Sequence, residues 1–144
     1  MIEAMLAVNG GRFRFDADLL ADLAPPVWPE ALLVRAQGQV ADVIGSYLHL
    51  PGPHRPQGAR GCVLGLHRSG EAIGISAGTD RAAADVIAWI CAVSKVPQPH
   101  EPGHVLLLDW MPDPLPMSAS MPAEELLRLR RMLRSSFFTG DHPE

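Results

Sequence analysis

The sequence predicts a single α+β domain in which helices cover one face of a mostly antiparallel sheet. Turn residues separate short strand-like segments, which can pair as hairpins. A long apolar segment with helical spacing follows the second of these expected hairpins. Hydrophobic residues make up 47% of the 144 residues and charged residues 19%, which is enough apolar surface for one core. We place this domain over residues 1–138 and expect a frayed tail over residues 139–144.

Two hairpins are expected, because glycine-containing turns lie between segments of alternating polarity. In the first, Asn9-Gly10-Gly11 supplies the turn, and Phe13 and Phe15 alternate with arginines. In the second, Arg68-Ser69-Gly70 supplies the turn. The four strands of these hairpins are residues 3–8, 12–15, 62–67 and 71–76.

Apolar spacing, caps and prolines predict the other elements. Asp16 or Asp18 caps a short helix that ends before Pro25-Pro26. For residues 40–50 both a helix and a strand fit, and the helical spacing of the apolar residues favours a helix. The remaining expected elements are strands at 31–36 and 105–110, the latter central in the sheet, a loop at 51–61, and helices at 79–96 and 122–135.

Charge and cysteine content restrict the class of protein. The net charge of −4 argues against nucleic-acid binding, since phosphate contacts need a positive surface. No apolar run approaches the ~18 residues of a membrane span, and the first residues do not resemble a secretory signal. Cys62 and Cys91 lie in apolar segments and are expected to be buried, reduced thiols. These features predict a soluble, cytoplasmic protein.

One short motif suggests catalysis. Residues 74–78, GISAG, match the G-x-S-x-G pattern with which serine hydrolases place a nucleophile on a sharp turn between a strand and a helix. Asp109 or Asp113 and then His142 follow Ser76 in the chain order that such enzymes use. A hydrolase of that fold, however, needs a parallel sheet before its nucleophile, and Thr79-Asp80 is a good helix cap that would leave Ser76 inside a strand. A strand end followed by a capped helix is the favoured interpretation.

A second motif suggests a metal. Residues 100–104, HEPGH, match the H-E-x-x-H pattern in which two histidines on one helix face bind zinc. Pro102 and Gly103 occupy the middle of the motif, and prolines precede it, so a helix is not expected. We therefore predict no metal, no cofactor and no catalytic residue.

Two segments could bind another protein. A tryptophan and a methionine leave the strand at 105–110 into a loop stiffened by prolines and flanked by acids, which suits an interface, although the tryptophan could equally fold back over the core. The last helix carries arginines along one side, which could dock an acidic partner or serve only as a solvated face. The candidate partner-binding residues are Asp109, Trp110, Met111, Asp113, Arg128, Arg131 and Arg134.

These observations predict a non-catalytic protein-binding domain whose partner is another protein, with a homodimer as one possibility and no binding to nucleic acid or membrane. Immunity and antitoxin proteins that neutralise bacterial toxins, and secretion chaperones, share this size and charge, which is an analogy of class only. The alternative is a serine-dependent esterase or acyl-transfer enzyme that uses Ser76. A third hypothesis is a domain with a ligand pocket under the loop at 51–61.

Overall fold

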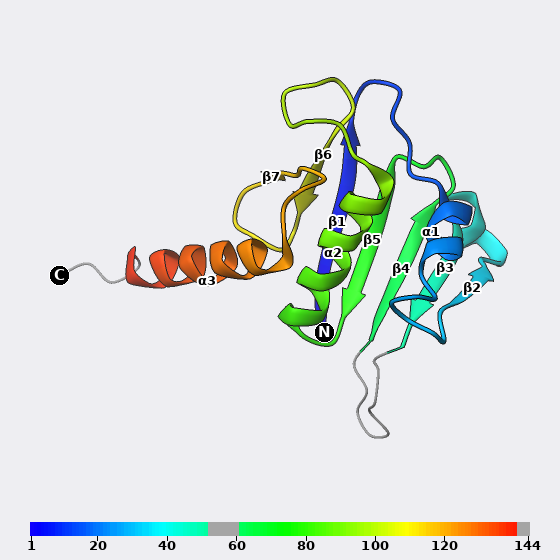
Figure 1. Cartoon of the computed structure of the whole chain (residues 1–144), viewed down its shortest axis with the longest axis horizontal. Coiled ribbons are helices and arrows are strands. Elements are labelled where there is room, and N and C mark those ends of the chain that lie inside the picture. Colours follow the sequence, from blue (N-terminus) through cyan, green and yellow to red (C-terminus); the bar gives the residue numbers. More distant parts are fainter. Residues whose placement is uncertain (52–60, 141–144) are drawn as a thin grey trace.

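The computed structural model describes residues 1–51 and 61–140, and for residues 134–140 only the helical backbone. Seven strands and three α-helices are described, together with one short 3-10 helix, η1 (Figure 1). In chain order they are β1 (Ile2–Asn9), α1 (Ala17–Leu23), β2 (Leu32–Arg35), η1 (Gly38–Asp42), β3 (Ile44–Leu50), β4 (Cys62–His67), β5 (Ala72–Ala77), α2 (Asp80–Ser94), β6 (His104–Leu108), β7 (Leu115–Pro116) and α3 (Ala123–Gly140).

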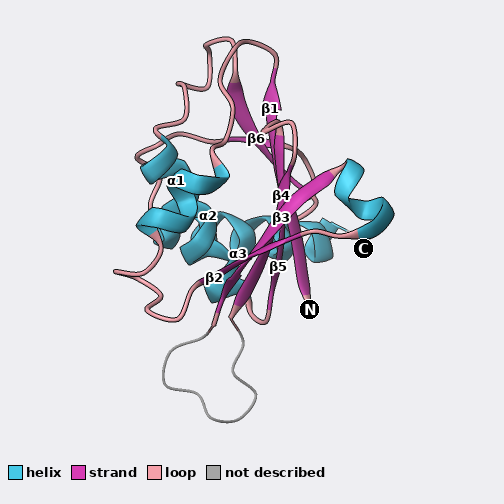
Figure 2. Cartoon of the chain, turned by 90° about the vertical axis from the view of Figure 1, so that its right-hand side faces the viewer, coloured by secondary structure: helices cyan, strands magenta, loops and turns pink. Residues whose placement is uncertain are grey.

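The strands form one sheet in the order β2-β3-β4-β5-β1-β6-β7, and every neighbouring pair is antiparallel. Helices α1 and α2 lie on the same side of this sheet, which the view turned by 90° shows edge-on (Figure 2). Helix α3 packs against α2 and leads away from the sheet. The fold is therefore α+β with helices on one face, as the sequence predicted.

The core lies between the sheet and helices α1 and α2. In the middle of the sheet, Ala4, Ile75, Leu64 and Leu48 are in register on four neighbouring strands, and all are buried. The apolar stripe of α2 covers them, and burying each of its large side chains contributes roughly 1.5–3 kcal/mol. Thr79 caps α2 by accepting a hydrogen bond from the amide of Ala82, which agrees with the predicted helix start.

The prediction of a first hairpin is wrong. Strand β1 is an interior strand: β5 pairs with one of its edges and β6 with the other, so no edge is free for residues 12–15. Those residues instead run past the second hairpin, where the amide of Phe15 donates to the carbonyl of Gly70 at 2.8 Å. Gly10 and Gly11 do have positive φ, at 71° and 66°, but they turn the chain away from β1 rather than back along it.

The prediction of a helix over residues 40–50 is also wrong. A 3-10 turn ends at Asp42, and residues 44–50 form β3 between β2 and β4. Ser46, Leu48 and Leu50 point to the buried side while Tyr47 and His49 point to the other side, a period of two. Strand partners on both edges outweigh the helical spacing of a short apolar run.

The strand predicted over residues 105–110 exists but is not central. Strand β6 ends at Leu108 and lies second from the edge, next to the two-residue β7. Val105 and Leu107 are fully buried, whereas Leu106 and Leu108 lie on the opposite side of the sheet and are half-buried. The unbroken apolar run therefore reflects a second apolar face of the sheet.

The two cysteines are buried and free, as predicted. Burial raises the pKa of the thiols of Cys62 and Cys91 to about 12, which keeps both protonated and unreactive at neutral pH.

The last helix is longer than predicted, since α3 continues to Gly140. Most of the predicted loop at 51–61 and the last residues of the predicted tail lie outside the described residues. None of the described helices is long and apolar enough to cross a bilayer.

Candidate functional site

The side of the sheet opposite α1 and α2 forms an apolar surface that we call the open face. Its strand positions alternate with the buried core positions and, apart from the buried Ala72, are half-buried or exposed. One row of it crosses six strands in register, from Val34 through Tyr47, Gly65, Gly74 and Met5 to Leu108. Leu32, His49, Val63, Ser76, Glu3, Ala7 and Leu106 lie beside this row.

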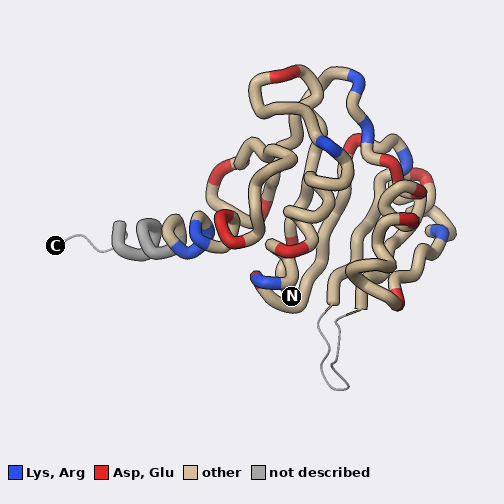
Figure 3. The backbone as a smooth tube through the Cα atoms, in the orientation of Figure 1, with Lys and Arg blue, Asp and Glu red and all other residues tan. Residues whose placement is uncertain are grey.

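The open face is poor in charge. In the described strands only Glu3 and Arg35 belong to the charged residue types, and Arg35 faces the helix side, in register with Ser46. Charges lie instead along the helices and loops, so that the strands are almost uniformly tan in Figure 3. A sheet face exposed to water normally carries polar side chains, and depletion of charge marks the centre of protein interfaces.

Two glycines shape the centre of this surface. Gly65 and Gly74 are paired across β4 and β5. A β-carbon at Gly74 would meet nothing within 4 Å, and one at Gly65 would meet only Ile44 and Tyr47, at 3.7 Å. The open face is therefore flat over these two residues, with Tyr47 on one side and Met5 on the other. Tyrosine and methionine are enriched in interfaces, and methionine adapts its shape to a partner.

Ser76 also lies on the open face, inside β5 and not on an elbow. Its hydroxyl donates to the carboxylate of Glu3, with Oγ–Oε1 and Oγ–Oε2 distances of 2.9 and 3.0 Å, and the two residues are in register on β5 and β1. Neither Gly74 nor Gly78 has the positive φ of a strained turn. No histidine within the described residues hydrogen-bonds to this hydroxyl, and the favoured interpretation of a strand end before a capped helix agrees with the structure.

Ser76 is therefore expected to be unreactive. An unactivated serine hydroxyl is a weak nucleophile, so a fluorophosphonate probe should label neither the wild-type protein nor Ser76→Ala. Ser76→Ala should change the free energy of unfolding by no more than about 1 kcal/mol, since one half-exposed hydrogen bond is lost. Gel fluorescence after labelling, with an active serine hydrolase as positive control, tests this. Labelling of the wild type but not of the variant would restore the esterase hypothesis.

The H-E-x-x-H segment is a turn. Gly103 has a φ of 85°, His104 begins β6, and Glu101 accepts a hydrogen bond from the amide of Gln98. The two histidines therefore do not share a helix face, which is the geometry that zinc binding by this motif requires. Within the described residues no cluster of three or more His, Cys, Asp or Glu side chains could hold a metal ion.

The loop after β6, which the sequence predicted to bind a partner, does not expose its tryptophan side chain to solvent. Trp110 is 2% exposed and Met111 is also buried, because the chain turns at Asp109, which has a φ of 70°, and folds back over the core. The indole N–H donates to Asp80 Oδ1 at 3.0 Å, and the guanidinium of Arg130 lies 4.8 Å from the ring centroid. Of the four residues predicted there, only Asp109 and Asp113 are exposed.

The predicted basic stripe of α3 is partly neutralised by acids of the same chain. Arg128 donates to both carboxylate oxygens of Glu125, at 3.0 and 2.6 Å, and this hydrogen bonding raises the pKa of the arginine and lowers that of the glutamate. Arg131 is exposed and forms no ion pair with a described residue, and the side chain of Arg134 lies outside the described part of the chain. A role for Arg128, Arg131 and Arg134 in partner binding remains a prediction.

Sequence reasoning missed the open face, although a signal for it was present. The strand segments VLLL and AIGISA contain almost no charged or large polar residues at either alternating position. Full burial in the middle of a sheet explains such a pattern, but so does a second apolar face without covering helices. The fold and the open face together define a class: a small α+β protein in which no α-helix among the described residues covers the charge-poor side of the sheet.

The comparisons with known proteins give no family for this class. No family model matches the chain, and no curated protein or solved structure is significantly similar to it.

Proposed function

We propose that this protein is a non-catalytic binding domain that docks another protein on the open face of its sheet. The observation that carries this proposal is the row from Val34 to Leu108, six residues in register without a charge. Leu32 and Val34, at one end of the face, are 59% and 40% exposed. Covering such side chains supplies the free energy of association.

The size of the open face suits a stable complex. Six neighbouring strands about 4.8 Å apart span roughly 24 Å. A standard interface buries about 800 Å² on each partner, a patch of comparable breadth. No reorganisation of the sheet is needed, so little of the association free energy is lost to ordering.

The charges on the open face favour a different protein, rather than a second copy of this chain, as the docking partner. Glu3 is the one acidic residue among the strand positions of the open face, and these positions include no lysine or arginine. In a face-to-face homodimer Glu3 would be buried without a lysine or arginine from the strands of this surface, which is costly. The partner that fits is therefore an apolar protein surface that places a lysine or arginine opposite Glu3. A cytoplasmic protein that neutralises a toxin or escorts a secreted protein would act through such a surface.

Site-specific photo-crosslinking in source cells tests this proposal. A photo-reactive phenylalanine analogue at Val34 is expected to yield one discrete adduct with a different protein. The same analogue at Leu23 of α1, which is 39% exposed against 40% for Val34, is expected to yield none. An adduct twice the mass of the chain would overturn the choice of partner in favour of a homodimer, and no adduct from any position of the open face would overturn the docking site.

Direct titration of the purified pair gives the quantitative test. Val34→Lys places a charge in the row and is expected to weaken binding at least about tenfold, since a buried unpaired charge is costly. Leu23→Lys, the matched control, should bind within twofold of the wild type. Thermal unfolding of both variants shows whether they are folded. Equal affinity of the two folded variants would contradict the proposal.

A further inference from the structure

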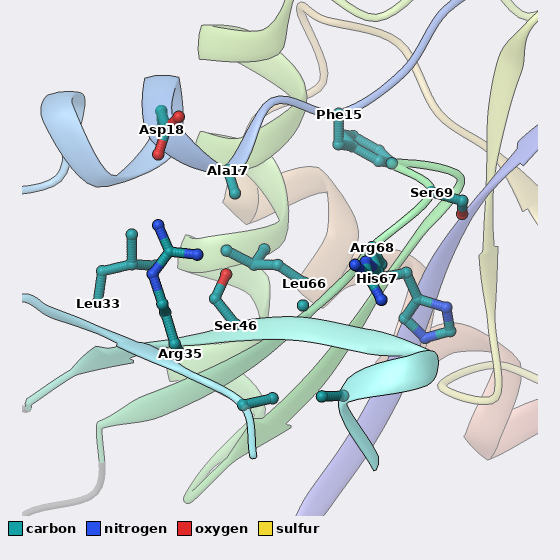
Figure 4. A pocket seen from close by; sticks show the side chains of 14 residues that line it. Phe15, Ala17, Asp18, Leu33, Arg35, Ser46, Leu66, His67, Arg68 and Ser69 are labelled. Atoms are coloured by element: carbon teal, nitrogen blue, oxygen red, sulfur yellow. The ribbon is translucent and has the colours of Figure 1, made fainter. Parts of the chain in front are cut away.

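A cavity of about 460 Å³ lies on the other side of the sheet, apart from the proposed docking face. It opens between the first turn of α1, the ends of β2 and β3, and the turn that joins β4 to β5 (Figure 4). Phe15, Leu33 and Leu66 form its apolar wall. A cavity of this size holds a small molecule.

Two arginines that line this cavity pair with no described residue. Arg35 reaches from β2 toward the start of α1, and Arg68 lies in the β4–β5 turn (Figure 4). Neither forms an ion pair or a side-chain hydrogen bond with a described residue. This contrasts with Arg14, Arg81, Arg128 and Arg130, each of which is paired with an acid.

A serine hydroxyl points into the same cavity. Ser46 is 9% exposed and is the only buried polar residue among those that the structure describes. It lies opposite Arg35 on the neighbouring strand, and in Figure 4 its oxygen is directed into the cavity. Its hydroxyl bonds to no described residue and is open to the cavity, since it is not among the polar atoms that are shut off from solvent without a partner. An anion bound in the cavity would accept a hydrogen bond from it.

We propose that this cavity binds a small organic anion, with its carboxylate or phosphate group held by Arg35, Arg68 and Ser46 and its apolar part against Phe15, Leu33 and Leu66. The arginine fork pairs with such oxyanions through two parallel hydrogen bonds. Asp18 and His67 also line the cavity. Two guanidinium groups against the one carboxylate of Asp18 favour an anion in the cavity, on a protein whose net charge is −4.

Nuclear magnetic resonance titration at constant ionic strength tests the site with three probes: benzoate, phenyl phosphate and inorganic phosphate. Benzoate or phenyl phosphate is expected to shift the amide signals of Ser46 and of residues 67–70 saturably. Comparison of the two separates a carboxylate site from a phosphate site. Inorganic phosphate, which lacks the apolar part, should bind more weakly. Absence of a saturable shift with all three probes would overturn the proposal.

Variants identify the groups that bind the anion. Arg35→Gln and Arg68→Gln are each expected to weaken binding about tenfold, since each removes a charge-assisted hydrogen bond, and Ser46→Ala should weaken it severalfold. Arg131→Gln, which removes an exposed arginine outside the cavity, should leave the affinity unchanged. If Arg131→Gln weakens binding as much as the two cavity variants, the effect is one of net charge and the proposed site is wrong. The three substituted arginines are exposed, so their variants are expected to fold, and thermal unfolding checks that Ser46→Ala, at a buried position, is folded.

Discussion

Replacement of Trp110 by alanine is expected to lower the free energy of unfolding by about 4 kcal/mol, because it removes the largest kind of side chain from a position that is 2% exposed. The substitution also removes the indole hydrogen bond to Asp80 and the stacking of Arg130 on the ring. Asp80 retains Arg130 as a partner, at 2.9 Å, so its carboxylate is not left buried and unpaired. The loss is therefore mainly one of packing.

Urea denaturation of wild type, Trp110→Ala and Trp110→Phe separates the contributions. Phenylalanine keeps most of the buried area and loses the indole N–H, so Trp110→Phe should cost only about 1–2 kcal/mol. Because Trp110→Ala acts on the fold, any loss of partner binding in this variant has to be judged against its lower stability. A cost below about 1.5 kcal/mol for Trp110→Ala would show that the side chain is not packed in the core in solution.

Gly11→Ala is expected to destabilise the protein by about 3 kcal/mol, whereas Gly10→Ala should cost only about 1 kcal/mol. Both glycines have positive φ, which disfavours alanine by about 1 kcal/mol in each case. A β-carbon at Gly11 would also lie 2.5 Å from the amide nitrogen of Gly103 and 2.7 Å from the carbonyl carbon of Pro102. At Gly10 it would meet nothing within 4 Å. The backbone at 102–103 must therefore shift in the first variant only.

The comparison of these neighbours tests how the chain leaves β1. In a simple hairpin turn, two successive glycines would have similar surroundings, and the two variants would lose similar stability. In the structure, Gly11 lies directly against the turn that precedes β6, and the amide of Gly103 donates to the carbonyl of Asn9 at 3.1 Å. Thermal unfolding of both variants checks this, and equal midpoints would contradict the packing of these two turns.

Elements that depend on neighbouring residues in the chain could be predicted. Helix α2 has its cap at Thr79, its apolar spacing and its end before Pro97 within one segment, and it was placed correctly. The same holds for the β4–β5 hairpin, where Gly70 adopts a φ of 77° in the turn. Local hydrogen bonds and side-chain spacing are sufficient in these cases, because each interaction is between residues close in sequence.

Elements that depend on distant strands could not be predicted. The edges of β1 pair with β5 and β6, about seventy and a hundred residues away, and this leaves no place for the expected partner at 12–15. Residues 44–50 became a strand because β2 and β4 flank them. The exposure of Trp110 could not be predicted for the same reason: the sequence shows an aromatic residue next to prolines, but only the fold places Trp110 against Asp80 and Arg130.

By itself the chain determined its class: one α+β domain, buried reduced thiols, and helix ends set by Asp16 and Thr79, all of which follow from local composition and capping. Only the tertiary structure decided which of the described apolar residues remain exposed and which of the described polar residues lack a partner among them. Apolar alternation tells which residues share a face, but strand order decides whether helices cover that face. The open row from Val34 to Leu108 and the cavity with Arg35, Arg68 and Ser46 exist because strands distant in sequence meet in one sheet.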